Sequence, residues 1–313
     1  MNEDKNNYPA WNALTVGVSD LDKALDLWRD KLGFKVSASS EGDDSELAKL
    51  WSLKGNDIAR QALIRCDNSD TGMLHLVQFN LPDQPVRKGA NNFDLVPKNL
   101  DIYVNDLPKK VAELRAAGVD FRTATHSDIK AADGTHFREI HMPSHDHINV
   151  VLIEIVGEPH AYNQAGIAGV GPFVFTVPNV EIESEFFTSM FRVDKLHENI
   201  FLGSKIEKMI GLPAGTALKI FIMGRKGHDL GKLEIVEYQG ANGDNLYPRA
   251  KPKALGILQM NYVVESSQLL KQRLHKANIL VNEHPNVSTL LGTGDLISFS
   301  SPAGLKIEVY SRA

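Results

Sequence analysis

A histidine-rich stretch near the middle of the chain carries the side chains that most often form catalytic metal centres. The segment REIHMPSHDHINVVLIEI contains His141, His145 and His147 between Glu139 and Glu154. Imidazole and carboxylate groups bind zinc, iron and manganese in proteins. The segment therefore predicts either a metal site formed locally along the chain or a hairpin whose turn is rich in histidine, and the surrounding elements must decide.

One strand, one helix and three strands form a pattern that recurs four times along the chain. In the first copy, ALTVGV alternates as a strand does, Asp20 is a typical helix N-cap, and Gly33 is a typical helix end. The same order returns near residues 99, 172 and 256. Copies one and three align at a shift of 159 residues, visible as GMLHLVQF over GKLEIVEY. Copies two and four align at 159 or 160, once a short insertion near the last hairpin of copy two is set aside.

A repeat of this length, made of two half-repeats, predicts two tandem domains of class α+β, each built from two βαβββ modules. The glycine-rich VGEPHAYNQAGIAGVGP is the expected linker between them. We assume that modules one and two form one domain and that modules three and four form the other. The expected bounds are 1–157 for the first domain (modules 13–80 and 99–156), 158–171 for the linker, and 172–313 for the second domain (modules 172–239 and 256–311).

The composition of the chain limits the classes of binding partner that we expect for it. The 313-residue chain has a net charge of −5 and a pI near 6.1, which give no overall attraction to nucleic acid or anionic membrane. It has no run of about 18 apolar residues that could span a bilayer. The polar residues 1–12 lack the apolar core of a signal peptide, and the single cysteine, Cys66, excludes an internal disulfide. We expect a cytoplasmic protein with neither a nucleic-acid nor a membrane partner.

The four modules resemble those of the vicinal oxygen chelate superfamily, which includes glyoxalase I, extradiol ring-cleaving dioxygenases, methylmalonyl-CoA epimerase and bleomycin or fosfomycin resistance proteins. The resemblance rests on VSDLDKALDLWRDKLGFKV, which opens the first module, and on SSPAGLKIEVYS, which closes the last. It covers nearly the whole chain. It implies that two modules pair into a curved mixed sheet around a cleft, and that metal ligands come from the first and last strands of each module.

Alternation along each strand divides its side chains between a helix-facing side and an open side. A charged residue at an interior position of a strand costs free energy unless it faces water, a partner or a metal. Two interpretations of the open sides are therefore kept: a solvated or mutually paired polar face, and a ligand-lined cleft. The open-side residues of interest are Ala13, Asn99, Asp101, Tyr103, Pro172, Gln259 and Asn261 on first strands, and His75, Glu154, Glu234, Glu308 and Tyr310 on last strands.

The resemblance implies four ligand positions in each half of the chain, and neither set is complete because alanine and proline have no ligating side chain. The triad of an extradiol dioxygenase would fall on Pro172, Gln259 and Glu308, which lack the two histidines that iron(II) oxygen chemistry favours. Glyoxalase-like isomerases use Gln, Glu and His ligands, which Glu234, Gln259 and Glu308 match in part. The implied positions are Ala13, His75, Asn99 and Glu154 in the first half and Pro172, Glu234, Gln259 and Glu308 in the second.

We therefore favour a divalent-metal-dependent lyase or isomerase that moves a proton next to a carbonyl of a small oxygenated metabolite. The metal is one of Mn, Mg, Fe, Zn and Ni, which the sequence does not distinguish, or there is none. Glu234 and Glu308 are the predicted catalytic residues. The predicted metal ligands are Glu234, Gln259 and Glu308, or His75, Asn99 and Glu154 as a second set; the predicted substrate contacts are Asp101, Tyr103, Asn261 and Tyr310.

Two other functions stay open: a diverged ring-cleavage dioxygenase, and a metal-free small-molecule binding or resistance protein. In all three, the partner is a small molecule and the chain is a monomer or a homodimer. Trp51, in LAKLWSLKG between the second and third strands of module one, either closes a cleft or packs against the core.

The order of elements within the modules predicts that the histidine stretch forms the last hairpin of module two. PSHDHIN occupies the position of the tighter SPAGL turn of module four. His145 lies in this turn, and His147 has the opposite strand parity from Glu154, so we expect neither to meet that carboxylate. His141 is left unassigned. Glu154 is the residue of this stretch that we expect in a site.

Overall fold

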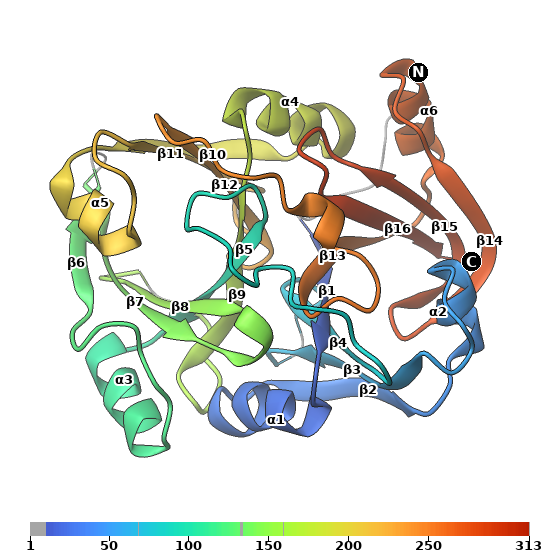
Figure 1. Cartoon of the computed structure of the whole chain (residues 1–313), viewed down its shortest axis with the longest axis horizontal. Helices are drawn as coiled ribbons and strands as arrows, with labels where there is room; N and C mark the ends of the chain where they lie inside the picture. Colours follow the sequence, from blue (N-terminus) through green and yellow to red (C-terminus); the bar gives the residue numbers. More distant parts are fainter. Residues whose placement is uncertain (1–10, 68, 132–133, 159, 313) are drawn as a thin grey trace.

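The computed structural model describes residues 11–67, 69–131, 134–158 and 160–312, so most of the polar N-terminal stretch lies outside the description. Within these residues, the strands form two eight-stranded mixed sheets. In Figure 1, strands from the blue and red ends of the chain make one sheet, and green and yellow strands make the other. The α+β fold expected from the repeat is confirmed.

The first sheet has the strand order β14-β15-β16-β13-β1-β4-β3-β2, and the second has the order β10-β11-β12-β9-β5-β8-β7-β6. The strands of the first sheet are β1 (Ala13–Val18), β2 (Lys35–Glu41), β3 (Ile58–Arg65), β4 (Met73–Phe79), β13 (Gly256–Val264), β14 (Asn282–Thr289), β15 (Gly292–Ser300) and β16 (Lys306–Arg312). Those of the second are β5 (Pro97–Val104), β6 (Ser127–Lys130), β7 (His136–Pro143), β8 (Asn149–Ile155), β9 (Ile167–Thr176), β10 (Asp194–Phe201), β11 (Ala217–Gly224) and β12 (Lys232–Gln239). The helical segments are α1 (Leu21–Leu25), the π-helical η1 (Asp26–Lys31), α2 (Ser45–Leu50), α3 (Leu107–Ala116), η2 (His145–His147), α4 (Val180–Phe191), α5 (Ser204–Ile210), η3 (Tyr247–Arg249) and α6 (Gln268–Lys276).

Each sheet combines modules from both halves of the chain. In the first sheet, β1 of module one pairs antiparallel with β13 of module four. In the second sheet, β5 of module two pairs antiparallel with β9 of module three. Our assumption that module one pairs with two, and three with four, is therefore wrong. The sequence repeat could not decide the pairing, because all four modules offer the same kind of first strand to a partner.

The connections between modules agree with this pairing. Residues 156–166 separate β8 from β9, so the chain turns back at once and β9 lies against β5; the expected linker 158–171 ends inside β9. The longer connections 80–96 and 240–255 cross between the sheets. They run side by side, joined by parallel bridges from Pro85 to Leu255 and from Leu95 to Asn245.

The helix-facing side of the central strands is apolar, as the alternation predicts. Leu14, Val16 and Val18 on β1 are fully buried, and so are Leu100 and Ile102 on β5. Each such side chain contributes roughly 1.5–3 kcal/mol through removal of apolar surface from water. These residues belong to one continuous core beneath the helices. The opposite face of each sheet is thereby left for polar side chains.

Asparagine and aspartate side chains determine where several helices begin. Asp20, Asp106 and Asn179 accept backbone N–H hydrogen bonds at the N-termini of α1, α3 and α4. These helices cover the apolar side of their sheets and fix the position of the strands that carry the site. In the described part of the chain, no helix has the length and apolar character needed to cross a membrane.

Candidate functional site

Each sheet has a cavity that is lined largely by residues of its strands. The cavity of the first sheet has a volume of about 360 Å³ and is lined by residues that include Trp51, Gln259 and Glu308; we call it the first cleft. The cavity of the second sheet has a volume of about 250 Å³ and is lined by residues that include Asp101 and Glu234; we call it the second cleft.

The pairing of modules divides the predicted ligand sets between these clefts. Gln259 and Glu308 lie together in the first cleft, but Glu234 lies in the second. Likewise, His75 belongs to the first sheet and Asn99 to the second. The two predicted sets, each drawn from one half of the chain, are therefore not formed. Each cleft instead receives residues from both halves.

Glu308 on β16 is held by hydrogen bonds at the floor of the first cleft. Trp51 Nε1 donates to Glu308 Oε1 at 3.0 Å, and the Tyr310 hydroxyl donates to Oε2 at 3.3 Å. Gln259 adds a further side-chain hydrogen bond. Burial raises the pKa of Glu308 to about 7, and these donors oppose the rise. Trp51, whose role the sequence left open, therefore contacts the polar floor of the cleft.

His75 on β4 is completely buried in the same sheet. Its Nε2 donates to Gln61 Oε1 at 2.8 Å, and its ring centroid lies 6.4 Å from that of Trp51. Burial lowers the pKa of His75 to about 4, so the ring is neutral at pH 7. Its Nδ1 has no hydrogen-bond partner among the described residues. His75 is thus a neutral imidazole with one nitrogen tied to an amide.

Gln259, which lines the first cleft, belongs to a group of hydrogen-bonded side chains on the first strands. Asn261 Nδ2 donates to Thr15 Oγ1 at 2.9 Å, across the junction of β13 and β1. Gln259 Nε2 lies 3.5 Å from Asn261 Oδ1. Asn261 and Tyr310, both predicted to contact substrate, are buried and are not among the residues that line the cavity. The amide and hydroxyl groups beside the cavity therefore satisfy one another.

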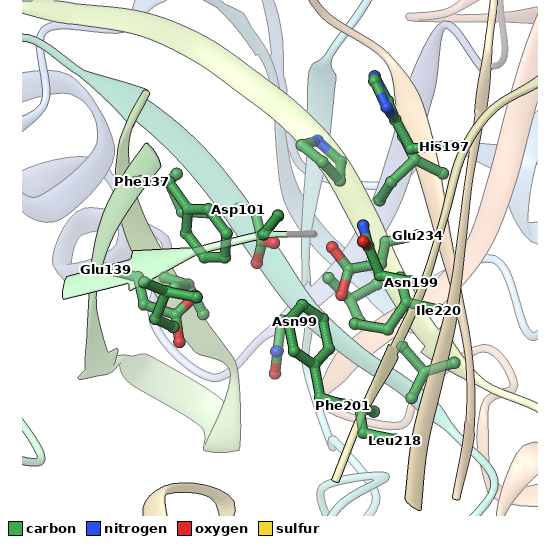
Figure 2. Close-up of a pocket in the computed structure, with 18 of the residues that line it drawn as sticks. Asn99, Asp101, Phe137, Glu139, His197, Asn199, Phe201, Leu218, Ile220 and Glu234 are labelled. Carbon is green, nitrogen blue, oxygen red and sulfur yellow. The ribbon is translucent and has the colours of Figure 1, made fainter. Parts of the chain in front are cut away.

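Three carboxyl groups from three strands face the second cleft. Asp101 lies on β5, Glu139 on β7 and Glu234 on β12, and Figure 2 shows them around one space. Burial raises the pKa of Glu139 to about 7, and burial together with the nearby Glu139 raises the pKa of Glu234 to about 7. Burial and then repulsion from both glutamates raise the pKa of Asp101 well above its usual value. Glu139 and Glu234 therefore have pKa values suited to gaining and losing a proton near neutral pH, which acid–base catalysis requires.

A lysine and a tyrosine border the carboxyl cluster. Lys98 Nζ, from β5, donates a hydrogen bond to the Tyr238 hydroxyl on β12, and both residues line the cleft. Burial and the nearby Arg87 lower the pKa of Lys98 to about 7, and Glu234 opposes this fall. The ammonium and the hydroxyl are hydrogen-bond donors that can reach an oxygen of a bound molecule.

Asn99, a predicted metal ligand, belongs to a network of amides in the second cleft. Asn149 Nδ2 donates to Asn99 Oδ1 at 2.9 Å and lies 3.0 Å from His141 Nδ1. Burial lowers the pKa of His141 to about 4, so this ring is also neutral. His141 Nε2 lies 3.9 Å from Glu139 Oε1. The network therefore leads from Asn99 to the carboxyl cluster. Tyr103, a predicted substrate contact, lines the cavity as well.

Glu154 faces neither cleft. It lies on the opposite side of β8, where its Oε2 accepts the Leu107 N–H at the start of α3 at 3.0 Å. The strand register pairs Asp101 with Val151, so Val151 occupies the position that aligns with Glu308. The prediction that Glu154 lies in a site is wrong by three residues, because the insertion near the histidine-rich turn shifts the alignment of module two.

The histidine stretch contributes to the site through other residues than the sequence indicated. His145 and His147 lie in the turn segment η2, as predicted. His145 Nε2 accepts a hydrogen bond from Trp28 Nε1 at 2.9 Å, which ties this turn to module one. Glu139 and His141 line the second cleft.

Sequence reasoning missed Glu139, although it shares strand parity with His141 on β7. It also missed Lys98, one of two charged residues in β5, a strand that is buried along its whole length.

The residues at the ligand positions do not fit a metal centre of the kind that the resemblance implies. Two of the four positions in the second sheet are valines, and in the first sheet the side chains of Thr15 and Asn261 hydrogen-bond to each other. In the described residues, no group of three His, Cys, Asp or Glu side chains is arranged to hold an ion. By strand register, the positions are Thr15, His75, Asn261 and Glu308 in the first cleft, and Asp101, Val151, Val174 and Glu234 in the second.

Comparison with known proteins agrees with this architecture. No family model and no curated protein matches the sequence. Among solved structures, a point mutant of glyoxalase I from Zea mays has a TM-score of 0.69 at 13% identity, covering 98% of this chain and 93% of that one. Glyoxalase I from Zea mays itself gives 0.65 at 14% identity, covering 96% and 92%. A proposed dioxygenase from Bacillus subtilis gives 0.58 at 12% identity, covering 96% and 84%. At these identities the similarity establishes the fold and leaves the reaction open.

Proposed function

Since this chain has the vicinal oxygen chelate fold, we propose that its second cleft is the active site of a small-molecule isomerase or lyase that works by proton transfer. The observation that supports this most is the cluster of Asp101, Glu139 and Glu234. Burial raises the pKa of Glu139 to about 7, burial and Glu139 raise that of Glu234 to about 7, and burial and both glutamates raise that of Asp101. A carboxyl group that exchanges its proton near pH 7 serves both as base and as acid.

The chemistry is proton abstraction next to a carbonyl group. Ionised Glu234 takes the proton, and the electrons of the broken C–H bond move onto the carbonyl oxygen to give an enolate. Lys98 and Tyr238, which border the cluster, donate hydrogen bonds to that oxygen. The carbonyl group then re-forms. In an isomerase, protonated Glu139 gives its proton to the other face of the carbon that lost one, which inverts that carbon; in a lyase, a group on the next carbon leaves with its electron pair and takes the proton.

This proposal differs from the hypothesis drawn from the sequence in the location of the active site and in the role of a metal. Glu234 remains the base, but Glu308 lies in the other cleft. We assign no step to a metal, because Val151 and Val174 occupy two ligand positions. The ring-cleavage alternative has less support, because Pro172 lies in the second sheet while Gln259 and Glu308 lie in the first.

A binding function without chemistry is the second candidate, and the first cleft favours it. There, Trp51, Tyr310 and Gln259 all hydrogen-bond to Glu308. The pKa of Glu308 is also about 7, but its oxygens already accept hydrogen bonds from three side chains of the protein, which suits it to orienting a ligand.

Deuterium exchange tests the proposed reaction. Hydroxyacetone and aminoacetone are incubated in D2O with the protein, and NMR follows exchange of the protons next to the carbonyl. We expect catalysed exchange that Glu234→Gln lowers by about 100-fold or more, because the base is removed. A chelator such as EDTA is expected to leave the rate unchanged.

Glu237→Gln is the matched control, because it makes the same change on the same strand but on the opposite face, where Glu237 accepts the Val180 N–H. It should retain the wild-type exchange rate. Exchange no faster than in buffer with either ketone, or full activity in Glu234→Gln, would contradict the proposal.

A further inference from the structure

The second cleft contains a buried carboxyl oxygen that no group of the described residues satisfies. Asp101 is 3% exposed and lines the cavity, and its Oδ1 has no hydrogen-bond partner in the described part of the chain. A buried acceptor without a donor lowers stability, and native proteins rarely leave one unpaired without a reason. This oxygen therefore points to a ligand that brings a hydrogen-bond donor into the cavity.

The charges around this oxygen are mainly negative. Glu139 and Glu234 face the same space as Asp101 (Figure 2). Lys98 is the positive group near enough to oppose the rise in the pKa of both Asp101 and Glu234. The pKa of Lys98 is itself about 7, so near neutral pH this side chain supplies at most one positive charge against three carboxyl groups. A ligand that kept all three ionised would have to supply positive charge.

Other titratable groups that line the cavity do not supply this charge. His141 is neutral at pH 7, because burial lowers its pKa to about 4. Burial also lowers the pKa of Lys232, whose ammonium lies 5.7 Å from the centroid of the Tyr103 ring and is attracted by Asp229 and Glu158. The remaining titratable residues that line the cavity are Tyr103, Tyr238, Glu158 and His197.

The arrangement fits an organic cation better than a metal ion. A metal needs ligand atoms within about 2.0–2.6 Å of one point, and no three His, Cys, Asp or Glu side chains of the described residues meet that condition. An ammonium group instead forms separate hydrogen bonds of about 2.7–3.2 Å to several acceptors. The rest of the wall is largely apolar, with Ile129, Phe137, Val151, Val174, Phe201 and Ile220 among its residues.

We propose that the second cleft binds a small organic cation, a protonated amine on a compact apolar or aromatic body, with the amine held among Asp101, Glu139 and Glu234. The apolar wall receives the body, and the cavity of about 250 Å³ restricts it to a small molecule. That this cation is a substrate, and not a molecule that is bound unchanged, rests on the proposed proton-transfer function.

Calorimetric titration with three probes that share one aromatic body tests the inference. The probes are 2-phenylethylamine, a cation; 2-phenylethanol, which is neutral; and phenylacetate, an anion. At about pH 7.5 we expect the amine to bind at least about tenfold more tightly than the alcohol, and phenylacetate to bind most weakly. Asp101→Asn, Glu139→Gln and Glu234→Gln should each weaken amine binding by about tenfold and leave alcohol binding within about twofold.

The pH dependence provides a second readout. A cation favours the ionised carboxylates, so amine affinity should rise between about pH 6 and pH 8 as groups with pKa near 7 lose their protons. Alcohol affinity should change little. The Glu237→Gln protein, altered on the other face of β12, should behave as wild type in both titrations.

Equal affinity for the three probes, including no binding of any, would overturn the inference, as would carboxyl variants that bind the amine normally. Stoichiometric binding of Mn²⁺ alone, lost in Glu234→Gln, would also overturn it in favour of a metal. Comparison of the titrations with the deuterium-exchange experiment distinguishes a failure of this inference from a failure of the proposed reaction. Amine preference without deuterium exchange supports this inference and contradicts the reaction, whereas exchange without amine preference does the reverse.

Discussion

Glu234 and Glu308 occupy equivalent positions on the last strands of modules three and four, yet their surroundings give them different chemistry. Glu308 receives hydrogen bonds from Trp51 and Tyr310. Glu234 lies near Glu139, whose charge helps to raise its pKa. The same side chain therefore anchors a hydrogen-bond network in one cleft and is available for proton exchange in the other. Neighbouring residues, and not the strand position, decide which.

Glu308→Gln should make the protein more stable at alkaline pH. The folded protein holds the Glu308 proton up to about pH 7, whereas the unfolded chain releases it near pH 4.5. Between these values the folded state binds more protons, so stability falls as pH rises, and above pH 7 the loss is complete. A neutral amide has no such dependence. At pH 8 we expect the variant to gain up to about 3 kcal/mol in the free energy of unfolding.

Urea unfolding at pH 5 and pH 8 measures this difference. The gain should be much smaller at pH 5, where the folded wild type is protonated at Glu308 and the amide replaces a neutral acid. A stability difference that is the same at both pH values would show that the carboxyl group is not the titrating residue.

The last strand of every module contributes a side chain to the start of the helix in the same module. This side chain lies three residues after the cleft-facing position, on the opposite face of the strand. It satisfies a backbone N–H at the helix N-terminus, and where it is acidic it also interacts favourably with the helix dipole. The four contacts are Gln78 with Leu21 at 2.9 Å, Glu154 with Leu107 at 3.0 Å, Glu237 with Val180 at 3.0 Å, and Ser311 with Ser267 at 3.1 Å.

Replacing one of these acceptors should destabilise the protein more when the acceptor oxygen is removed than when it is kept. We expect Glu237→Ala to lower the free energy of unfolding by about 1 kcal/mol, because the Val180 N–H loses its partner. Glu237→Gln should cost less than about 0.5 kcal/mol, since Gln78 already serves in module one. Chemical denaturation of the two variants measures both values; an equal loss in both would mean that the charge, and not the acceptor, stabilises α4.

Across the whole molecule, the sequence predicted the modules and their strand faces better than it predicted what they form together. The repeat and the alternation gave the βαβββ units and the buried side of β1 and β5, because apolar periodicity is local. Module pairing is a long-range choice between equivalent edges, and the local pattern carries no information about it. Glu154 was assigned to the wrong face for a related reason: the insertion before β8 changes strand register, and register alone decides which face a residue occupies. Glu139 lies on β7, before the insertion, and its parity with His141 was visible in the sequence.

The pairing of modules one with four and two with three has a consequence that hydrogen exchange can measure in the whole chain. Leu74 on β4 and Leu152 on β8 are both fully buried, so Leu→Ala at either site should cost about 2–5 kcal/mol. Leu74→Ala should speed amide exchange in β13–β16, more than 180 residues away, and affect β5–β8 less. Leu152→Ala, the matched variant, should speed exchange in β9–β12 and affect β1–β4 less. If Leu74→Ala instead opened β5–β8 more than β13–β16, modules would pair within each half of the chain, and both clefts would have to be rebuilt from different residues.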